Sequence, residues 1–214
     1  MLLTACVVLL LSLFGVVHVV EATKGIDVST LVSSSDFQCL KKEGYDFLIV
    51  RAYRNIGKPD SNAVQTIKNA RHAGFGHVDV YMFPCPQCSK PASVQVQEMV
   101  SALRGVSYGE IWLDIEKSSY WTGGYFGNQN FFEELLSEAS KHKRTGVYTS
   151  KSQWNEIMGS SYTGGSSHRL WYAHYDNHMS FSDFTPFGGW HTPAMKQYAG
   201  DQTVCGVGVD LNMY

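Results

Sequence analysis

Two carboxylates that stand two residues apart are the side chains of this sequence best placed for catalysis. Asp114 and Glu116 belong to the segment Glu110-Ile-Trp-Leu-Asp-Ile-Glu116. In a β-strand they project to the same side, about 6.6 Å apart, because each residue rises about 3.3 Å. A like charge nearby raises the pKa of one carboxyl and keeps it protonated as a general acid. Hydrolysis of a glycosidic bond needs such a pair, one acid for the leaving oxygen and one carboxylate for the cation-like centre.

Two further acids occupy similar positions. Asp27 lies in Gly-Ile-Asp-Val-Ser and Asp210 in Gly-Val-Asp-Leu-Asn, each at the end of a predicted strand. If the first and last strands are neighbours, both acids face the same mouth as the pair at 114 and 116. The alternative is structural, since Asp at a strand end commonly caps the following helix or turn.

The elements that must position these acids alternate along the chain. Short β-branched or aromatic runs predict eight strands, at 25–29, 47–53, 78–83, 111–116, 146–149, 170–175, 195–199 and 207–211. Helical spacing of apolar residues predicts helices after the early strands, the strongest one around Phe131–Ala139 with Asn128 or Asn130 as its cap. Residues 176–193 contain Pro186, Gly188, Gly189 and Pro193 and predict a loop.

This order predicts an α/β fold. Alternating strands and helices form a parallel sheet, and eight strands in this length favour a closed, modified TIM-like barrel, (β/α)5(β)3, without helices after the last strands. An open doubly wound sheet is the alternative, but the sequence has neither GxGxxG nor GxxxxGK[ST] to hold a nucleotide.

The first 22 residues predict an export signal. Residues 1–20 are almost wholly apolar, and Val20-Glu21-Ala22 gives a small-residue cleavage pattern. We therefore expect residues 1–22 to be a signal peptide and 23–214 a single secreted domain. The alternative is an uncleaved membrane anchor.

The cysteines agree with export. Four remain after the leader, namely Cys39, Cys85, Cys88 and Cys205, and four cysteines allow three pairings. The predicted topology places Cys39 and Cys205 together at the bottom rim and Cys85 and Cys88 at the top rim, so we expect those two disulfides. Cys85-Pro-Gln-Cys88 is alternatively a redox pair or half of a zinc site, although no second CxxC occurs.

Composition excludes several function classes. The net charge of -2 provides no basic field for nucleic acid. No Gly-x-Ser-x-Gly elbow supports a serine hydrolase, and His174 and His178 lack a helical metal motif. We expect no cofactor, no metal, no nucleic-acid partner and no stable membrane association after cleavage.

Several segments resemble the glycoside hydrolase family 25 lysozymes, also called Chalaropsis-type muramidases. The resemblance runs from Gly25 to Tyr214. It rests on Gly25-Ile-Asp-Val-Ser29, Phe47-Leu-Ile-Val-Arg-Ala52, Ala73-Gly74 followed by Tyr81-Met-Phe83, Leu113-Asp-Ile-Glu116, Gly146-Val-Tyr148, Leu170-Trp171 with Tyr175, Gln197-Tyr198, and Gly208-Val-Asp-Leu-Asn212.

The resemblance implies a barrel enzyme that hydrolyses the β-1,4 bond between N-acetylmuramic acid and N-acetylglucosamine in bacterial peptidoglycan. By motif position Glu116 is the general acid, and Asp114, Asp27 and Asp210 complete the acidic site. Whether an acid or the acetamido group of the substrate attacks the sugar carbon is open. Two departures bear on substrate preference: the loop 30–37 lacks the Trp common there in bacterial members, and the Cys85–Cys88 tip is extra.

Aromatic residues near strand ends suit stacking on sugar rings, although barrel cores bury the same residues. The candidates for substrate binding are Tyr81, Phe83, Trp171 and Tyr175. We expect a monomeric, secreted muramidase for antibacterial defence or digestion. The alternatives are a catalytically silent glycan-binding or signalling protein on the same fold, and a hydrolase of a chitin-like polymer.

Overall fold

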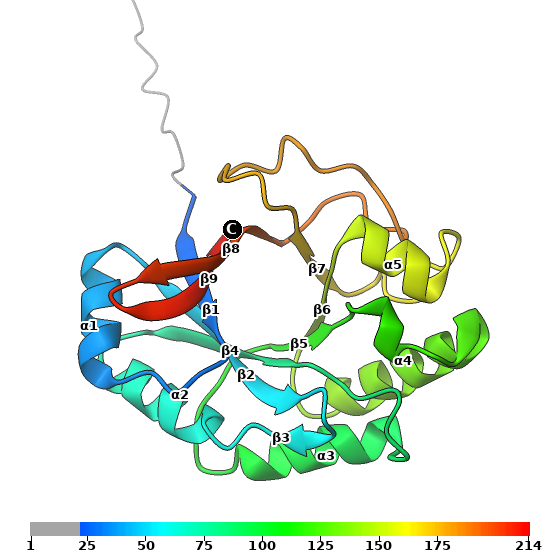
Figure 1. The fold of residues 1–214 in the computed structure, drawn as a ribbon, viewed down its shortest axis with the longest axis horizontal. Helices are drawn as coiled ribbons and strands as arrows, with labels where there is room; N and C mark the ends of the chain where they lie inside the picture. The colour runs from blue at the N-terminus through cyan, green and yellow to red at the C-terminus, as the bar shows by residue number, and fades with distance from the viewer. Residues whose placement is uncertain (1–21) are drawn as a thin grey trace, which may run out of the picture.

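The computed structural model describes residues 22–214, and the predicted leader therefore lies almost wholly outside the described residues. Eight strands close into a ring and five α-helices pack around part of it (Figure 1). The expected (β/α)5(β)3 barrel is confirmed. In the part of the chain from residue 22 onward, no helix is long and apolar enough to cross a membrane.

The ring strands follow one another around the barrel in the order β1, β2, β4, β5, β6, β7, β8 and β9. Their bounds are β1 Lys24–Val28, β2 Phe47–Arg54, β4 His77–Met82, β5 Ile111–Asp114, β6 Thr145–Thr149, β7 Arg169–Ala173, β8 Met195–Val204 and β9 Val207–Met213. A ninth strand, β3 (Lys58–Pro59), was not predicted; it pairs with β2 outside the ring.

The helices connect the early strands. Their bounds are α1 Ser34–Lys42, α2 Ala63–His72, α3 Ala92–Ala102, α4 Gly124–Ser140 and α5 Lys151–Met158, with a 3-10 turn, η1, at Ser118–Tyr120. Ser33 starts α1 with a capping box to Asp36. No helix or strand occurs between β7 and β8, as the Pro and Gly residues of this segment predicted.

The predicted start of α4 is wrong. Asn128 lies four residues inside the helix and is buried. Its side chain accepts a hydrogen bond from the backbone N–H of Gly123 and donates to the carbonyls of Trp121 and Ile157. The amide therefore joins the helix to the preceding loop and to α5 instead of capping a terminus.

The last strand runs opposite to its neighbours. β9 is antiparallel to both β8 and β1, because β8 continues to Val204 and only Cys205 and Gly206 separate it from β9. Both turn residues have positive φ, which suits a two-residue hairpin. The parallel arrangement expected from the alternating strands and helices therefore holds from β1 to β8, and the last strand closes the barrel as one arm of a hairpin.

Alternation along the strands gives the barrel two cores. Outward residues such as Leu48 and Leu113 pack under the helices. Inward residues fill the ring, namely Phe47, Ile49, Trp112, Tyr148, Trp171 and Met195. Gly25 and Gly146 make room for them, because a Cβ at either glycine would overlap the ring of Phe47 or of Trp112.

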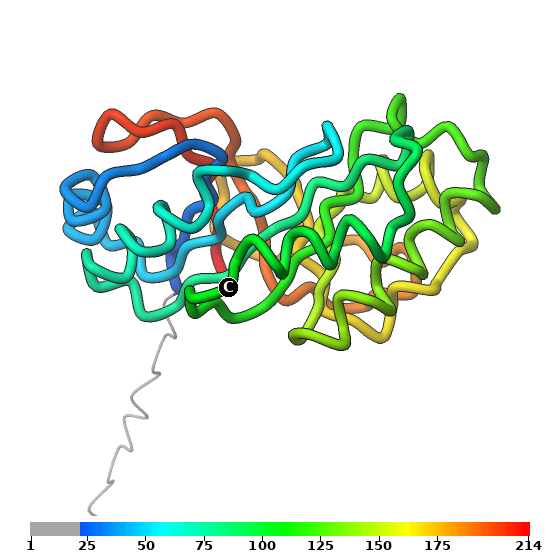
Figure 2. The backbone as a smooth tube through the Cα atoms, turned by 90° about the horizontal axis from the view of Figure 1, so that it is seen from below, coloured from blue at the N-terminus to red at the C-terminus, as the bar shows by residue number. Residues whose placement is uncertain are grey.

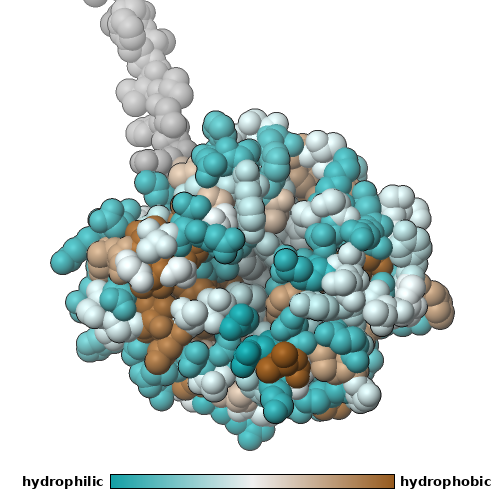
Figure 3. Space-filling view, in the orientation of Figure 1, coloured by the Kyte–Doolittle hydropathy of each residue, from teal (hydrophilic) through white to brown (hydrophobic). Residues whose placement is uncertain are grey.

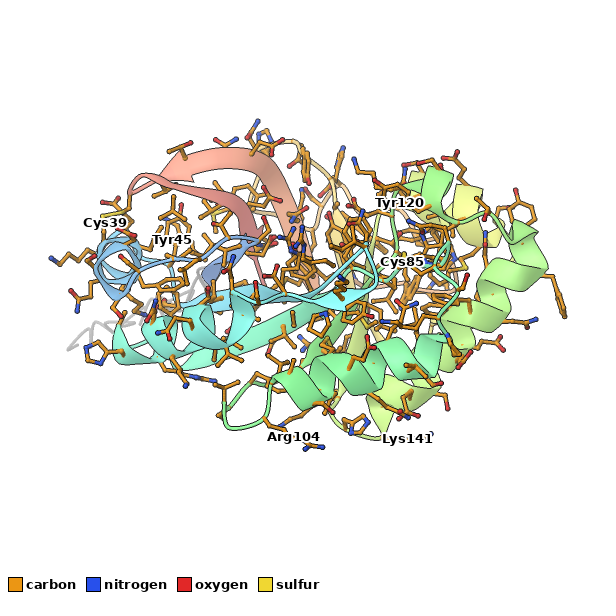
Figure 4. All side chains as sticks on the ribbon, turned by 60° about the horizontal axis from the view of Figure 1, so that its bottom comes forward. Cys39, Tyr45, Cys85, Arg104, Tyr120 and Lys141 are labelled. Carbon is orange, nitrogen blue, oxygen red and sulfur yellow. A yellow bond between two sulfur atoms is a disulfide. The ribbon has the colours of Figure 1, made fainter. Side chains whose placement is uncertain are left out.

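Two disulfides have the expected pairing, Cys39–Cys205 and Cys85–Cys88. The expected location of the first is wrong, since Cys205 lies at the tip of the β8–β9 hairpin, beyond the carboxyl end of β8. The hairpin extends outward over α1, which carries Cys39 (Figures 1 and 4). Seen from below, the blue, cyan and red segments lie in one half of the molecule, and most of the green and yellow segments lie in the other (Figure 2).

Candidate active site

A cavity of about 320 Å³ opens at the carboxyl ends of the parallel barrel strands. We call it the acid cavity. In the space-filling view the surface is hollowed over the middle of the ring (Figure 3). Its lining residues are Asp27, Tyr81, Asp114, Glu116, Lys117, Tyr148, Trp171, Tyr175, Gln197, Gly200, Asp201 and Asp210.

The strands bring all four predicted acids to this cavity. Asp27 on β1 stands directly opposite Asp210 on β9 in the antiparallel register. Asp114 is the last residue of β5, and Glu116 follows two positions later on the same side. Asp210 therefore reaches the mouth from the interior of an antiparallel strand, and not from the end of a parallel one as expected.

Amide groups hold Asp27 in place. Its Oδ2 atom accepts hydrogen bonds from Nε2 of Gln197 at 2.7 Å and from Nδ2 of Asn212 at 2.8 Å. Asn212 is in turn oriented by the indole N–H of Trp171, which donates to its Oδ1 at 2.8 Å. Both amide residues are buried. Asp27 is thus fixed by neutral donors.

Gln197 connects both sides of the cavity. Its Nε2 donates to Oδ2 of Asp210 at 3.3 Å in addition to Asp27. Its Oε1 accepts from the hydroxyls of Tyr148 at 2.6 Å and Tyr175 at 2.7 Å. In this orientation the NH2 group of the amide faces the two acids, and its carbonyl oxygen faces the two phenols.

The environment raises the pKa of all four acids. For Asp27, burial followed by the charge of Asp210 raises the pKa to about 8. Burial, with the charges of Glu116 and Asp27, raises the pKa of Asp114 well above its ordinary value. Burial also raises the pKa of Glu116, against the opposing charge of Lys117, and that of Asp210. Among the described residues no ion pair joins any of these carboxyls to a cation.

This arrangement can deliver a proton and stabilise positive charge. Glu116 is only partly buried, so its carboxyl reaches the open space of the cavity. Asp114 is buried, and its Oδ1 atom has no hydrogen-bond partner within residues 22–214. An oxygen of this kind is able to accept a donor from a bound molecule. Asp114 and Glu116 therefore differ in exposure, as an orienting group and an acid would.

The aromatic candidates divide into three groups. Tyr81 and Tyr175 line the acid cavity, and the side chain of Tyr175 is exposed. Trp171 also lines it but is only 1% exposed, so it supports Asn212 and the ring of Tyr148 and offers no open face for stacking. Phe83 does not line this cavity; its ring faces Tyr120 at 6.1 Å, in the half of the molecule that holds Cys85 (Figure 4).

Sequence reasoning missed the site roles of Gln197, Lys117 and Asp201, which line the cavity, and of Asn212, which holds Asp27. Gln197 and Asn212 each interrupt an apolar strand with a buried amide. A polar residue at an inward strand position was the available signal. Asp201 and Lys117 have positive φ and lie outside any such pattern, and the backbone N–H of Asp201 donates to Asp210 at 2.7 Å.

A second cluster of polar side chains lies after β7. The ligand-type atoms of His174, Asp176 and Asp183 lie within 4.8 Å of one another. The ammonium of Lys196 donates to Asp176 at 2.7 Å and to Asp183 at 2.8 Å. The buried ammonium of Lys196 thus occupies the position that a metal ion would take between these carboxylates. We call this group the lysine cluster.

Comparison with known proteins gives a consistent result. Residues 18–198 match the family model described as "Lysozyme-like protein 1". The chain is 49% identical over 97% of its length to "Probable GH family 25 lysozyme 2" of Dictyostelium discoideum, covering 98% of that protein, and 47% identical over 95% to "Probable GH family 25 lysozyme 4" of that organism, covering 94%.

Solved structures share the fold. A family GH25 lysozyme from Aspergillus fumigatus has a TM-score of 0.75 at 21% identity, over 91% of this chain and 94% of that one. The modular autolysin LytC from Streptococcus pneumoniae, solved in complex with a synthetic peptidoglycan ligand, has a TM-score of 0.68 at 16% identity, over 90% of this chain and 46% of that one.

Proposed function

Because the chain belongs to the glycoside hydrolase family 25 lysozymes, we propose that it is a secreted N-acetylmuramidase of bacterial peptidoglycan. Family membership makes it a lysozyme-type glycoside hydrolase. We further propose that the bond hydrolysed is the β-1,4 linkage from N-acetylmuramic acid to N-acetylglucosamine, and we assign a role to each acid. The complex of the similar autolysin with a peptidoglycan ligand supports this substrate class.

The observation that carries the proposal is the meeting of four carboxyls with raised pKa in one cavity. Glu116 gives its proton to the glycosidic oxygen as the bond to the sugar carbon breaks. Asp27, Asp114 and Asp210 surround the positive charge that develops on the sugar. Glu116, now a carboxylate, then takes a proton from the water that completes hydrolysis.

Asp114 orients the acetamido group of the substrate. Its Oδ1 atom, which has no hydrogen-bond partner within residues 22–214, can accept a hydrogen bond from the N–H of the acetamido group. The carbonyl oxygen of the same acetamido group would then attack the sugar carbon. A substrate without the acetyl group should be cut far more slowly. Equal rates on both substrates would contradict this role.

Secretion is supported by the apolar first 22 residues and by the two disulfides, which persist in oxidising compartments. N-terminal sequencing of protein from the culture medium of expressing cells tests this part. We expect the mature chain to begin at residue 23. Protein retained in the membrane fraction would indicate the anchor instead.

The activity is tested with oxidised residues 23–214 on purified peptidoglycan, with mass spectrometry of the released fragments. We expect fragments with muramic acid at the reducing end. Glu116→Gln should lower the rate by about a hundredfold to ten-thousandfold, the usual contribution of a general acid. Glu43→Gln is the matched control, because this exposed residue lies outside the acid cavity. No release by folded wild-type protein between acidic and neutral pH would favour a glycan-binding protein or another glycan.

A further inference from the structure

The acid cavity continues into a groove that the proposed reaction does not yet use. A second cavity of about 280 Å³ shares Glu116, Tyr148 and Tyr175 with the acid cavity. A third, of about 390 Å³, shares Ser150, Ala173 and His174 with the second. Each cavity thus adjoins the next through shared lining residues, and we call the series from the acids to the segment that follows β7 the groove.

The far end of this groove has an aromatic floor. We call it the aromatic pocket; its walls are Tyr172, Ala173, His174, Asp183, Phe184, Thr185 and Phe187, with residues 150–152 on the other side. The ring of Phe184 lies 5.1 Å from that of Tyr172 and 6.0 Å from that of Phe187. The hydroxyl of Tyr172 donates to Asp183, so this floor is held in place.

The aromatic pocket carries one exposed cation. Lys151 is exposed at the edge of the aromatic pocket, and within residues 22–214 it forms no ion pair. The carboxylate of the pocket, Asp183, already contacts the ammonium of Lys196. The pocket thus combines apolar surface with one unbalanced cation.

The other end of the groove is different in kind. A cavity of about 300 Å³ shares Asp27, Tyr81, Asp201 and Asp210 with the acid cavity. Its further walls are Gly208, Val209 and four residues with hydroxyl or amide side chains, Ser29, Thr30, Gln202 and Thr203. Such groups suit hydrogen bonds to the hydroxyls of a sugar chain. The aromatic pocket at the other end of the groove differs, because aromatic rings form its floor.

We propose that the aromatic pocket binds the peptide that the muramic acid sugar carries on its lactyl group. This inference rests on the proposed function. Such a peptide offers alanine methyl groups to the aromatic floor and free carboxylates to Lys151. The exposed ammonium of Lys151 favours the peptide carboxylates at this end of the groove. The pocket then selects peptide-bearing strands over bare glycan.

Two variants test the pocket on two substrates. Glycan strands are prepared with their peptides and, from the same batch, after removal of the peptides by an amidase. Thr185→Trp fills the pocket from an exposed position, and Lys151→Glu reverses its charge. Lys68→Glu, an exposed change on α2 away from the groove, is the matched control. Melting temperatures verify that each variant is folded.

We expect both variants to lower kcat/KM on peptide-bearing strands by about tenfold, mainly through KM, and to leave the rate on stripped strands unchanged. Equal losses on both substrates would make the pocket a sugar site and overturn the proposal. No loss on either substrate would also overturn it. Failure of the proposed function is distinguishable, since the wild-type protein would then cut neither substrate, and the peptide assignment would fall with it.

Discussion

The acid cavity and the lysine cluster both contain paired aspartates, but the pKa values are raised in the first and lowered in the second. Asp27 and Asp210 receive hydrogen bonds from amides, and their pKa values are raised. Asp176 and Asp183 contact the ammonium of Lys196, which is 0% exposed. Burial works to raise their pKa values too, but hydrogen bonds from Lys196 hold both below the usual range.

The contrast identifies the counterion as the deciding feature. A cation in contact makes an acidic pair permanently ionised, and the pair then ties the segment after β7 to β8. Where no cation is in contact, burial and the neighbouring Asp210 raise the pKa of Asp27 to about 8, so this acid keeps a proton near neutral pH. Raised pKa values thus separate the candidate site from a structural cluster at the same edge of the barrel.

The two clusters also contribute pH dependences of opposite sign to the free energy of unfolding. Acids with a lowered folded-state pKa stabilise the fold above their unfolded-state pKa and lose that contribution as pH falls. Asp27 is the reverse case. Its folded form keeps a proton between pH 3.8 and about 8, so its contribution decreases as pH rises through that window.

Lys196→Met should have the largest effect on stability. It leaves Asp176 and Asp183 without their shared cation, and we expect a loss of about 3 kcal/mol in the free energy of unfolding at pH 7. Urea unfolding measures it. Lys41→Met is the control, because Lys41 pairs with the exposed Asp46 and should lose at most about 1 kcal/mol. Similar losses for both variants would remove the distinction between a buried and an exposed pair.

Asp27→Asn should stabilise the protein while lowering its activity. The asparagine cannot ionise, so we expect a gain at pH 8 and almost none at pH 4; a shift of about four pKa units, at about 1.4 kcal/mol each, sets the upper limit of the gain at about 6 kcal/mol. Thermal or urea unfolding across this range gives the slope. A variant with the same slope as wild type would show that Asp27 does not hold the proton.

Gln197→Met should raise the pKa of Asp27 further. The substitution removes the Nε2 donor that favours the ionised carboxylate, and we expect a destabilisation of about 1–2 kcal/mol from the hydroxyls left unpaired. NMR titration of the Asp27 carboxyl follows the pKa. Tyr175→Phe, which removes a bond only to Oε1 of Gln197, should move it much less. A downward shift in Gln197→Met would contradict the assigned orientation of the amide.

Lys117→Gln should have the smallest effect, on the pH profile. The charge of Lys117 lowers the pKa of Glu116, so its removal should shift the alkaline limb of activity upward by about a few tenths of a pH unit. Rates between pH 4 and 8 measure the shift, with Lys143→Gln as control. An unmoved limb would assign that titration to a different group.

Most of the barrel was predictable because each strand carries its own signal. β-branched residues with period two mark β1, β2 and β4 to β7 within a few residues. The direction of β9 depends on where β8 ends, because a two-residue turn after Val204 reverses the chain. The exposed polar residues 201–203 continue that strand and resemble a loop in sequence. The length of β8 is determined by its pairing with β9 across the hairpin, and not by the local β-propensity of residues 201–203.

The acids of the candidate site were predictable, but what surrounds them was not. Asp27, Asp114, Glu116 and Asp210 stand at strand positions that the sequence marks. Gln197 and Asn212 are recognised only when the ring closes and places β8 and β9 beside β1. The burial of Trp171 likewise results from Trp112 and Tyr148 on neighbouring strands, which no local pattern reveals.

The Cys39–Cys205 bond turns most of this chain into a covalent ring. Its two cysteines are 166 residues apart, so the bond encloses every strand from β2 to β8. A protease that cuts one loop inside the ring therefore yields two pieces that stay joined, and both walls of the groove remain attached to each other. An enzyme built this way should survive a single nick with its fold intact, and reducing and non-reducing gels of a trypsin-treated, still active sample would distinguish nicked from uncut chains.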